Sequence, residues 1–379
     1  MYSVVDDYSP VRPRASCEAQ FARISARAKS RSPVALRSVR TIVMSMFLVC
    51  IGVTAGCGRP QGMLFPQLDP PRVWPPPPDT PRIKLLGILS DSRDLNAGQS
   101  GMEVIKAAFR GPRPPVRFSG PHGLAVRNPG VLAIADPGGG SVHLIDLDSR
   151  SHHMVSGFGD QRFAAPVGAA WAGERLFVTD AQRHEVIELD SVGGFRQRFG
   201  SDVLKRPVGI AYVPKRRQLY VVDGNAHHLT VFDLAGKLIK TIGQRGTAPG
   251  EFNFPTHICS AGDRFLVADS GNFRVQLLDL DGHCVKTIGQ KGDGAGDLSL
   301  PKGVAFDGDG HVYVIDAHFE NIQIFDEVGQ LLMAFGEEGS DPGKFSLPAG
   351  LAIDDQDRIW VADSGNHRVQ VFEYMRTSS

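Results

Sequence analysis

The sequence predicts an all-β protein that forms a closed ring of six four-stranded antiparallel sheets. Three observations lead to this prediction. Six copies of one pattern, Pro-x-Gly-x-Ala followed by an apolar run that ends in Asp, fill the chain from residue 121 onward. Each copy contains short β-branched or apolar runs separated by turn formers, as expected for four strands. A lone sheet of this size cannot bury both faces, and a ring lets each copy cover its neighbour without leaving long open edges.

The Asp of each copy marks the repeat. It lies at Asp136, Asp180, Asp223, Asp269, Asp316 and Asp363, at spacings of 44, 43, 46, 47 and 47 residues. A carboxylate at the end of a strand accepts hydrogen bonds from the amides of the next turn. We therefore expect these six side chains to stabilise turns rather than to bind a ligand. Arg274 and Arg368, five positions after their Asp, are expected to brace the same turns.

The sixth copy ends at Tyr374 and lacks a fourth strand. Upstream of the first copy, Arg-Ile-Lys-Leu-Leu-Gly-Ile-Leu at 82–89 is similar to the outer strands expected at 237–243 and 284–289. We therefore expect residues 81–90 to supply the missing strand and to close the ring.

The two best-preserved copies read Val-Ala-Asp-Ser-Gly-Asn-Phe-Arg at 267–274 and Val-Ala-Asp-Ser-Gly-Asn-His-Arg at 361–368. These segments resemble the NHL repeat. The resemblance covers residues 119–374 and implies a six-bladed β-propeller of four-stranded antiparallel blades. Propellers of this type are commonly interaction modules, so the resemblance also implies a binding function.

The charge balance is an average over unlike parts. The chain has 41 basic and 41 acidic residues, but residues 1–56 hold eight basic and three acidic ones. The remainder carries 33 basic against 38 acidic residues. A nucleic-acid-binding protein needs a basic surface to neutralise phosphates, so this composition argues against that class of partner.

The N-terminal segment predicts export. Residues 41–55 are uncharged and mostly apolar, follow Arg37 and Arg40, and are too few to span a bilayer, as in the core of a signal peptide. Thr54-Ala55-Gly56-Cys57 resembles a bacterial lipoprotein cleavage box, which implies lipidation of Cys57 and a membrane-anchored protein in the periplasm or on the cell surface. Thr54 stands where Leu is usual, so ordinary secretion is the alternative. The 40 residues ahead of the core are either a mis-assigned start or a genuine extension.

The expected domains are a leader and signal peptide at 1–56, a Pro-rich tether at 57–80 and the propeller at 81–374, with an insertion at 91–118 and blades from about 119. Four consecutive prolines at 75–78 predict an extended spacer without packing of its own. Residues 102–109 have the apolar spacing of one short helix, expected to cover the rim of the ring. Cys259 and Cys284 fall on the innermost and outermost strands of one copy, too far apart for a disulfide.

The loops that enter the innermost strands and the turns after the repeat Asp should lie at one end of the ring, here called the Asp-turn face. We expect this face to bind a protein or peptide partner. Phe319, between His318 and Glu320, is expected either to contact a partner or to pack against a neighbouring strand. The candidate binding residues are His122, His184, His227, His257, Phe273, Lys302, His318, Phe319, Glu320 and His367.

Two histidines allow a second interpretation. The segment Pro121-His122-Gly123 is similar to the Pro-His segments of peptidyl-α-hydroxyglycine α-amidating lyase, in which such histidines bind zinc. A catalytic zinc needs about three protein ligands, but only one of the six copies has His after its Pro, and His257 is one residue out of register. His122 and His257 are therefore weak candidates for a zinc or calcium site, and a metal-assisted lyase or lactonase is the alternative function. The main expectation has no catalytic residue and no cofactor.

Overall fold

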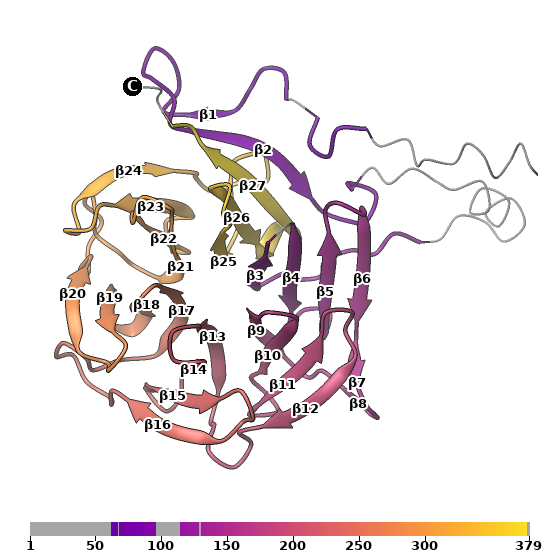
Figure 1. Cartoon of the computed structure of the whole chain (residues 1–379). Helices are drawn as coiled ribbons and strands as arrows, with labels where there is room; N and C mark the ends of the chain where they lie inside the picture. Colours follow the sequence, from indigo (N-terminus) through magenta and orange to yellow (C-terminus); the bar gives the residue numbers. More distant parts are fainter. Residues whose placement is uncertain (1–61, 67, 96–113, 129, 377–379) are drawn as a thin grey trace, which may run out of the picture. The chain divides into compact units, whose positions relative to one another are not determined.

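The computed structural model describes residues 62–66, 68–95, 114–128 and 130–376. In this part of the chain six sheets surround a common axis, which confirms the six-bladed β-propeller (Figure 1). The expected leader, the signal peptide, Cys57 and the helix at 102–109 lie outside the described residues. Within the described residues, no helix has the length and hydropathy needed to cross a membrane.

Each blade runs from an inner strand at the axis to an outer strand at the periphery (Figure 1). The strands of blades 1 to 3 are Gly123–Arg127 (β3), Val131–Asp136 (β4), Ser141–Asp146 (β5), Ser151–Val155 (β6); Pro166–Ala172 (β9), Arg175–Asp180 (β10), Glu185–Asp190 (β11), Phe195–Phe199 (β12); Pro207–Val213 (β13), Gln218–Asp223 (β14), His228–Asp233 (β15) and Leu238–Ile242 (β16). Those of blades 4 to 6 are Pro255–Ala261 (β17), Arg264–Asp269 (β18), Arg274–Asp279 (β19), Cys284–Ile288 (β20); Pro301–Phe306 (β21), Val312–Asp316 (β22), Asn321–Phe325 (β23), Leu331–Phe335 (β24); Pro348–Ile353 (β25), Arg358–Asp363 (β26) and Arg368–Tyr374 (β27). A small hairpin of Gly157–Phe158 (β7) and Gln161–Arg162 (β8) lies between blades 1 and 2.

The N-terminal strand closes the ring as the sequence predicts. Ile83–Leu89 (β2) pairs antiparallel with β27, with Ile83 opposite Tyr374 and Leu89 opposite Val369. The sixth blade is therefore built from both ends of the propeller sequence. Strand β27 is therefore hydrogen-bonded on both sides, to β26 and to β2.

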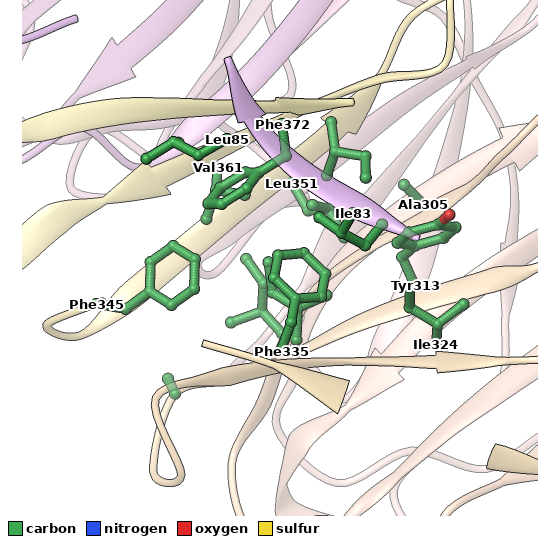
Figure 2. Packing of buried hydrophobic residues seen from close by; sticks show 14 residues of the cluster. Ile83, Leu85, Ala305, Tyr313, Ile324, Phe335, Phe345, Leu351, Val361 and Phe372 are labelled. Atoms are coloured by element: carbon green, nitrogen blue, oxygen red, sulfur yellow. The ribbon is translucent and has the colours of Figure 1, made fainter. Parts of the chain in front are cut away.

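Six clusters of buried apolar side chains hold the blades together, one at each junction between neighbours, including the junction of blade 6 with blade 1. Figure 2 shows the cluster between blades 5 and 6, in which Ile83 and Leu85 of β2 lie beside Phe372, Phe335 and Tyr313. Ile83 is fully buried. Full burial of such a side chain contributes about 1.5–3 kcal/mol, so the closing strand adds apolar contacts as well as hydrogen bonds.

The expectation of a spacer without packing is wrong for the described residues just ahead of β2. Val73–Trp74 (β1) pairs with β2, and the Trp74 ring packs 5.8 Å from that of Phe372. Phe65 packs against Trp360 and occupies the space over Gly87, where any Cβ would clash with its ring. These half-buried aromatic residues thus pack on blade 6, which the proline pattern alone does not indicate.

Cys259 and Cys284 are both free, as the strand assignment predicts, and both are half-buried. Burial raises the pKa of the Cys259 thiol to about 11. The thiol is therefore protonated and unreactive at neutral pH.

Candidate binding face

The repeat Asp carboxylates define the Asp-turn face. All six are fully buried. Asp180 accepts hydrogen bonds from the amides of Ala164 (2.7 Å) and Ala165 (2.9 Å), in the loop that enters blade 2, and from that of Arg183 (3.1 Å), in the turn after β10. Each carboxylate thus connects an entering loop with its own blade, and both kinds of loop lie at one end of the ring as expected.

In blades 4 and 6 the same carboxylates bind side chains instead of turn amides. The turns there are short 3-10 helices, Ser270–Asn272 (η2) and Ser364–Asn366 (η3). Arg274 Nε donates to Asp269 (2.8 Å) and Arg368 Nε donates to Asp363 (2.7 Å). Both arginines also donate to backbone carbonyls of the entering loops. Their expected bracing role is confirmed, and it extends to the loops.

Three equivalent loops enter blades 4, 5 and 6. Each has twelve residues between outer and inner strand, and each contains the same isolated parallel bridge. The residue just before the inner-strand proline is large, apolar and exposed in all three: Phe254 at 50%, Leu300 at 37% and Leu347 at 56%. We call these three side chains the apolar rim. The corresponding residues of blades 1 to 3 are Gly120, Ala165 and Arg206.

Two of the expected binding residues hold the rim in place. The Phe254 amide donates to His227 Nδ1 (3.1 Å), and the Leu347 amide donates to Glu320 Oε1 (3.3 Å). Phe254 and Leu347 have φ of 46° and 48°, a left-handed conformation that costs a non-glycine residue about 1 kcal/mol. His227 is buried, which lowers its pKa, so its ring is neutral and can accept this bond. These two side chains therefore position the exposed residues.

The other turn residues differ in exposure. His184, His318 and His367 are exposed, and Phe273 and Phe319 are half-buried. The ammonium group of Lys291 lies 5.0 Å from the centre of the Phe273 ring, and the ring of His318 lies edge-on to that of Phe319 at 5.4 Å. Phe319 is thus partly exposed and contacts the ring of its neighbour His318, and its role in binding a partner stays a prediction.

His122 and His257 meet at the axis. His122 begins blade 1 and His257 lies in blade 4, yet their rings stack with centres 5.1 Å apart and planes 16° apart. In blade 4 the Thr256 hydroxyl forms a hydrogen bond with the Ser270 hydroxyl (2.8 Å), and the next residue, His257, stacks on His122. Nδ1 of each histidine is buried without a hydrogen-bond partner among the described residues. Burial and the nearby Lys302 lower the pKa of His122 to about 4 and that of His257 well below its usual value.

Lys302 lies beside this histidine pair. It begins blade 5, is half-buried, and forms no ion pair or hydrogen bond with the described residues. Burial lowers the pKa of its ammonium group. The centre of the Asp-turn face therefore carries a partly desolvated positive charge without a counterion, next to two neutral imidazoles.

These residues do not fit a resident catalytic metal. Nearly parallel stacked rings direct their nitrogen lone pairs alongside one another, whereas zinc requires them to converge at about 2.0–2.1 Å. The described residues contain no group of three or more His, Cys, Asp or Glu side chains that could hold a metal ion. The nearby Lys302 ammonium also repels a cation. Calcium, which prefers several oxygen ligands, fits this set no better.

Residues 345–372 match the NHL repeat model. The chain carries an NHL repeat. A sequence search of curated proteins found no match. Three solved structures are similar in fold: a Bacteroides thetaiotaomicron protein of unknown function (16% identity, 69% of this chain and 70% of that chain, TM-score 0.55), an auxiliary nutrient binding protein from the same organism (15%, 68% and 70%, 0.52), and a catalytically inactive virginiamycin B lyase from Staphylococcus aureus with quinupristin (13%, 68% and 95%, 0.51). At these identities the likeness shows the propeller fold alone.

None of the three residues of the apolar rim is among the candidate binding residues that the sequence pattern indicates. A signal for it exists, because a large apolar residue directly precedes the repeat proline only in the last three copies. Its exposure depends on the loop conformation, which the pattern does not indicate.

Proposed function

We propose that this NHL-repeat propeller is a non-catalytic scaffold that binds a protein or peptide on its Asp-turn face. The apolar rim beside the unpaired Lys302 carries this proposal. Exposed large apolar side chains gathered on one face are typical of binding sites. A half-buried ammonium group without a carboxylate partner favours an acidic group on the ligand. The partner therefore presents apolar side chains next to a carboxylate, either an Asp or Glu side chain or a chain terminus.

The fold does not choose between binding and catalysis, because propellers support both. The set of side chains at the axis favours binding. It has neutral histidines and a lysine but no convergent metal ligands, so the metal-assisted lyase has no third ligand among the described residues.

The proposed location is the bacterial cell envelope, with a lipid on Cys57 as the anchor. This part of the proposal is supported by the apolar core at 41–55 and the cleavage-box resemblance of residues 54–57. Cells grown with a labelled fatty acid should attach the label to the natural protein but not to a Cys57→Ala variant. A natural protein without the label, or a variant that carries it, would contradict the lipid anchor.

Selection from a random peptide display library tests the binding function. Peptides that bind the purified protein should combine apolar residues with Asp, Glu or a free C-terminal carboxylate. Replacing the whole rim with Asn (Phe254→Asn, Leu300→Asn and Leu347→Asn) should weaken these peptides at least about tenfold, since Asn removes the apolar surface and tolerates the left-handed conformation. Lys302→Gln should weaken the acidic peptides selectively.

A matched control changes three exposed apolar residues outside the rim, Val192, Leu238 and Val328, to Asn. This control should bind the selected peptides like the natural protein. The proposal fails if no peptide is enriched, or if the rim variant and the control bind the same peptides equally well.

A further inference from the structure

A polar pocket opens on blade 2. Its volume is about 430 Å³, within the range of small-molecule sites. We call it the Glu185 pocket, and it is lined by Gln182, Arg183, Glu185, Arg198, Phe199 and Ser201. These residues come from the turn after β10, the start of β11, the end of β12 and the loop that follows β12.

The loops beside this pocket are short. The loop that enters blade 2 has ten residues and folds into the β7–β8 hairpin, and the loop that leaves it has seven, compared with twelve in each of the three long loops. Glu185 stands at the repeat position of Arg274 and Arg368, whose guanidinium groups bind loop carbonyls in blades 4 and 6. An acceptor-only carboxylate cannot make those bonds. Blade 2 therefore lacks both the longer loop and the side chain that would bind it.

The carboxylate in the pocket is incompletely paired. Glu185 is 5% exposed, and its Oε2 lies 3.8 Å from Arg198 Nη1. Its Oε1 is buried without a hydrogen-bond partner among the described residues. Burial raises the pKa of this carboxyl group, while Arg198 and Arg183 act in the opposite direction. An unsatisfied buried acceptor costs about 1–3 kcal/mol, and a ligand donor at Oε1 would remove that cost.

Arg183 and Arg198 lie beside Glu185, and hydrogen bonds fix their positions. Gln161 Oε1 accepts from Arg183 Nη1 (2.8 Å) and from Arg198 Nη1 (2.7 Å). Arg183 Nε also donates to the Arg162 carbonyl (2.8 Å). Nη2 of each guanidinium binds nothing in the described part of the chain and remains free to donate. Guanidinium donors of this kind suit carboxylates.

These charges define the class of ligand. Two guanidinium groups repel a simple cation, and a simple anion offers no donor to Glu185 Oε1. An α-amino acid carries an ammonium and a carboxylate group on the same carbon atom, so the two groups can lie against adjacent groups of opposite charge such as Glu185 and Arg198, whose Oε2 and Nη1 are 3.8 Å apart. We propose that the Glu185 pocket binds a free α-amino acid, with its ammonium group on Glu185, its carboxylate on Arg183 and Arg198, and its side chain near the Phe199 ring. This site is separate from the apolar rim and does not depend on the proposed scaffold function.

Saturation-transfer NMR with an equimolar mixture of the twenty standard L-amino acids tests the proposal on the whole chain. At least one amino acid should receive saturation from the protein. Calorimetry on that amino acid should then show at least about tenfold weaker binding when its amine is acetylated or its carboxylate is amidated, because each change removes one of the two charges. Binding that survives both changes would overturn the proposed recognition.

Two variants locate the site. Glu185→Gln keeps the shape of the side chain and should weaken binding at least about tenfold, and Arg198→Gln should do the same from the carboxylate side. Glu174→Gln, an exposed acid at the opposite end of blade 2, is the matched control and should bind like the natural protein. Circular dichroism establishes that each variant is folded. The proposal is wrong if none of the twenty amino acids binds, or if folded Glu185→Gln and Arg198→Gln bind as tightly as the control.

Discussion

The blades that follow the three long loops and the blades with shorter loops use the same repeat differently. In blades 4 and 6 the buried Asp pairs with an arginine, and that arginine binds the backbone of a twelve-residue loop. In blade 2 the arginine is replaced by Glu185, the loops on either side are shorter, and a pocket lies open. The comparison teaches that an arginine at this repeat position binds the entering loop, whereas a carboxylate at the same position lines a pocket.

The largest effect should come from Arg368 in blade 6. Changing Arg368 to Met leaves buried Asp363 without its ion-pair partner and removes the donors to three loop carbonyls. Breaking a buried pair costs about 3–5 kcal/mol. Urea denaturation should show a loss of unfolding free energy in that range.

Glu185→Gln is the control at the same repeat position in blade 2, because it changes a charge that lacks a close partner. Burial raises the folded-state pKa of Glu185, so its ionised form lowers stability at neutral pH. The variant should be as stable as the natural protein or slightly more so. Equal losses for Arg368→Met and Glu185→Gln would break the comparison.

A smaller difference should separate two outer strands. Ile83→Ala on the closing strand removes a fully buried side chain and should cost about 2–5 kcal/mol. Leu238→Ala on the outer strand of blade 3 removes a side chain that is 42% exposed and should cost less than about 0.5 kcal/mol. Thermal unfolding of both variants measures the difference. Equal losses of stability for the two variants would show that β1 and Trp74 do not shield the closing strand from solvent.

A further effect concerns pH, where blades 1 and 4 meet at the axis. The pKa of His122 is lowered to about 4, below its unfolded value near 6.5. The unfolded chain therefore binds more protons between these values, and the unfolding free energy falls as the pH falls, by at most about 1.4 kcal/mol per pH unit for this histidine. His122→Gln should lose less stability than the natural protein between pH 6.5 and 4. Parallel curves of unfolding free energy against pH for the two proteins would mean that the His122 imidazole is not desolvated.

Particular residues show how much of the candidate sites could be predicted from the sequence. His122 and His257 were recognisable from their positions near repeat prolines, but their stacking across the axis required the ring to close. His227 and Glu320 were recognisable as unusual turn residues. That they hold the backbone of the next blade depends on the geometry between blades. The packing of Trp74 could not be predicted from its proline-rich surroundings, because it depends on an aromatic cluster formed by residues distant in sequence.

The sequence by itself determined the number of blades, their four-stranded plan and the strand that closes the ring. These features follow from local periodicity, turn residues and the need of each sheet for a covered face, all of which are written along the chain. Only the tertiary structure decided which side chains are exposed and which charges lack partners. Exposure of the apolar rim and the open Glu185 pocket depend on loop lengths and on neighbouring blades, since solvent access and pairing are properties of residues brought together from separate repeats.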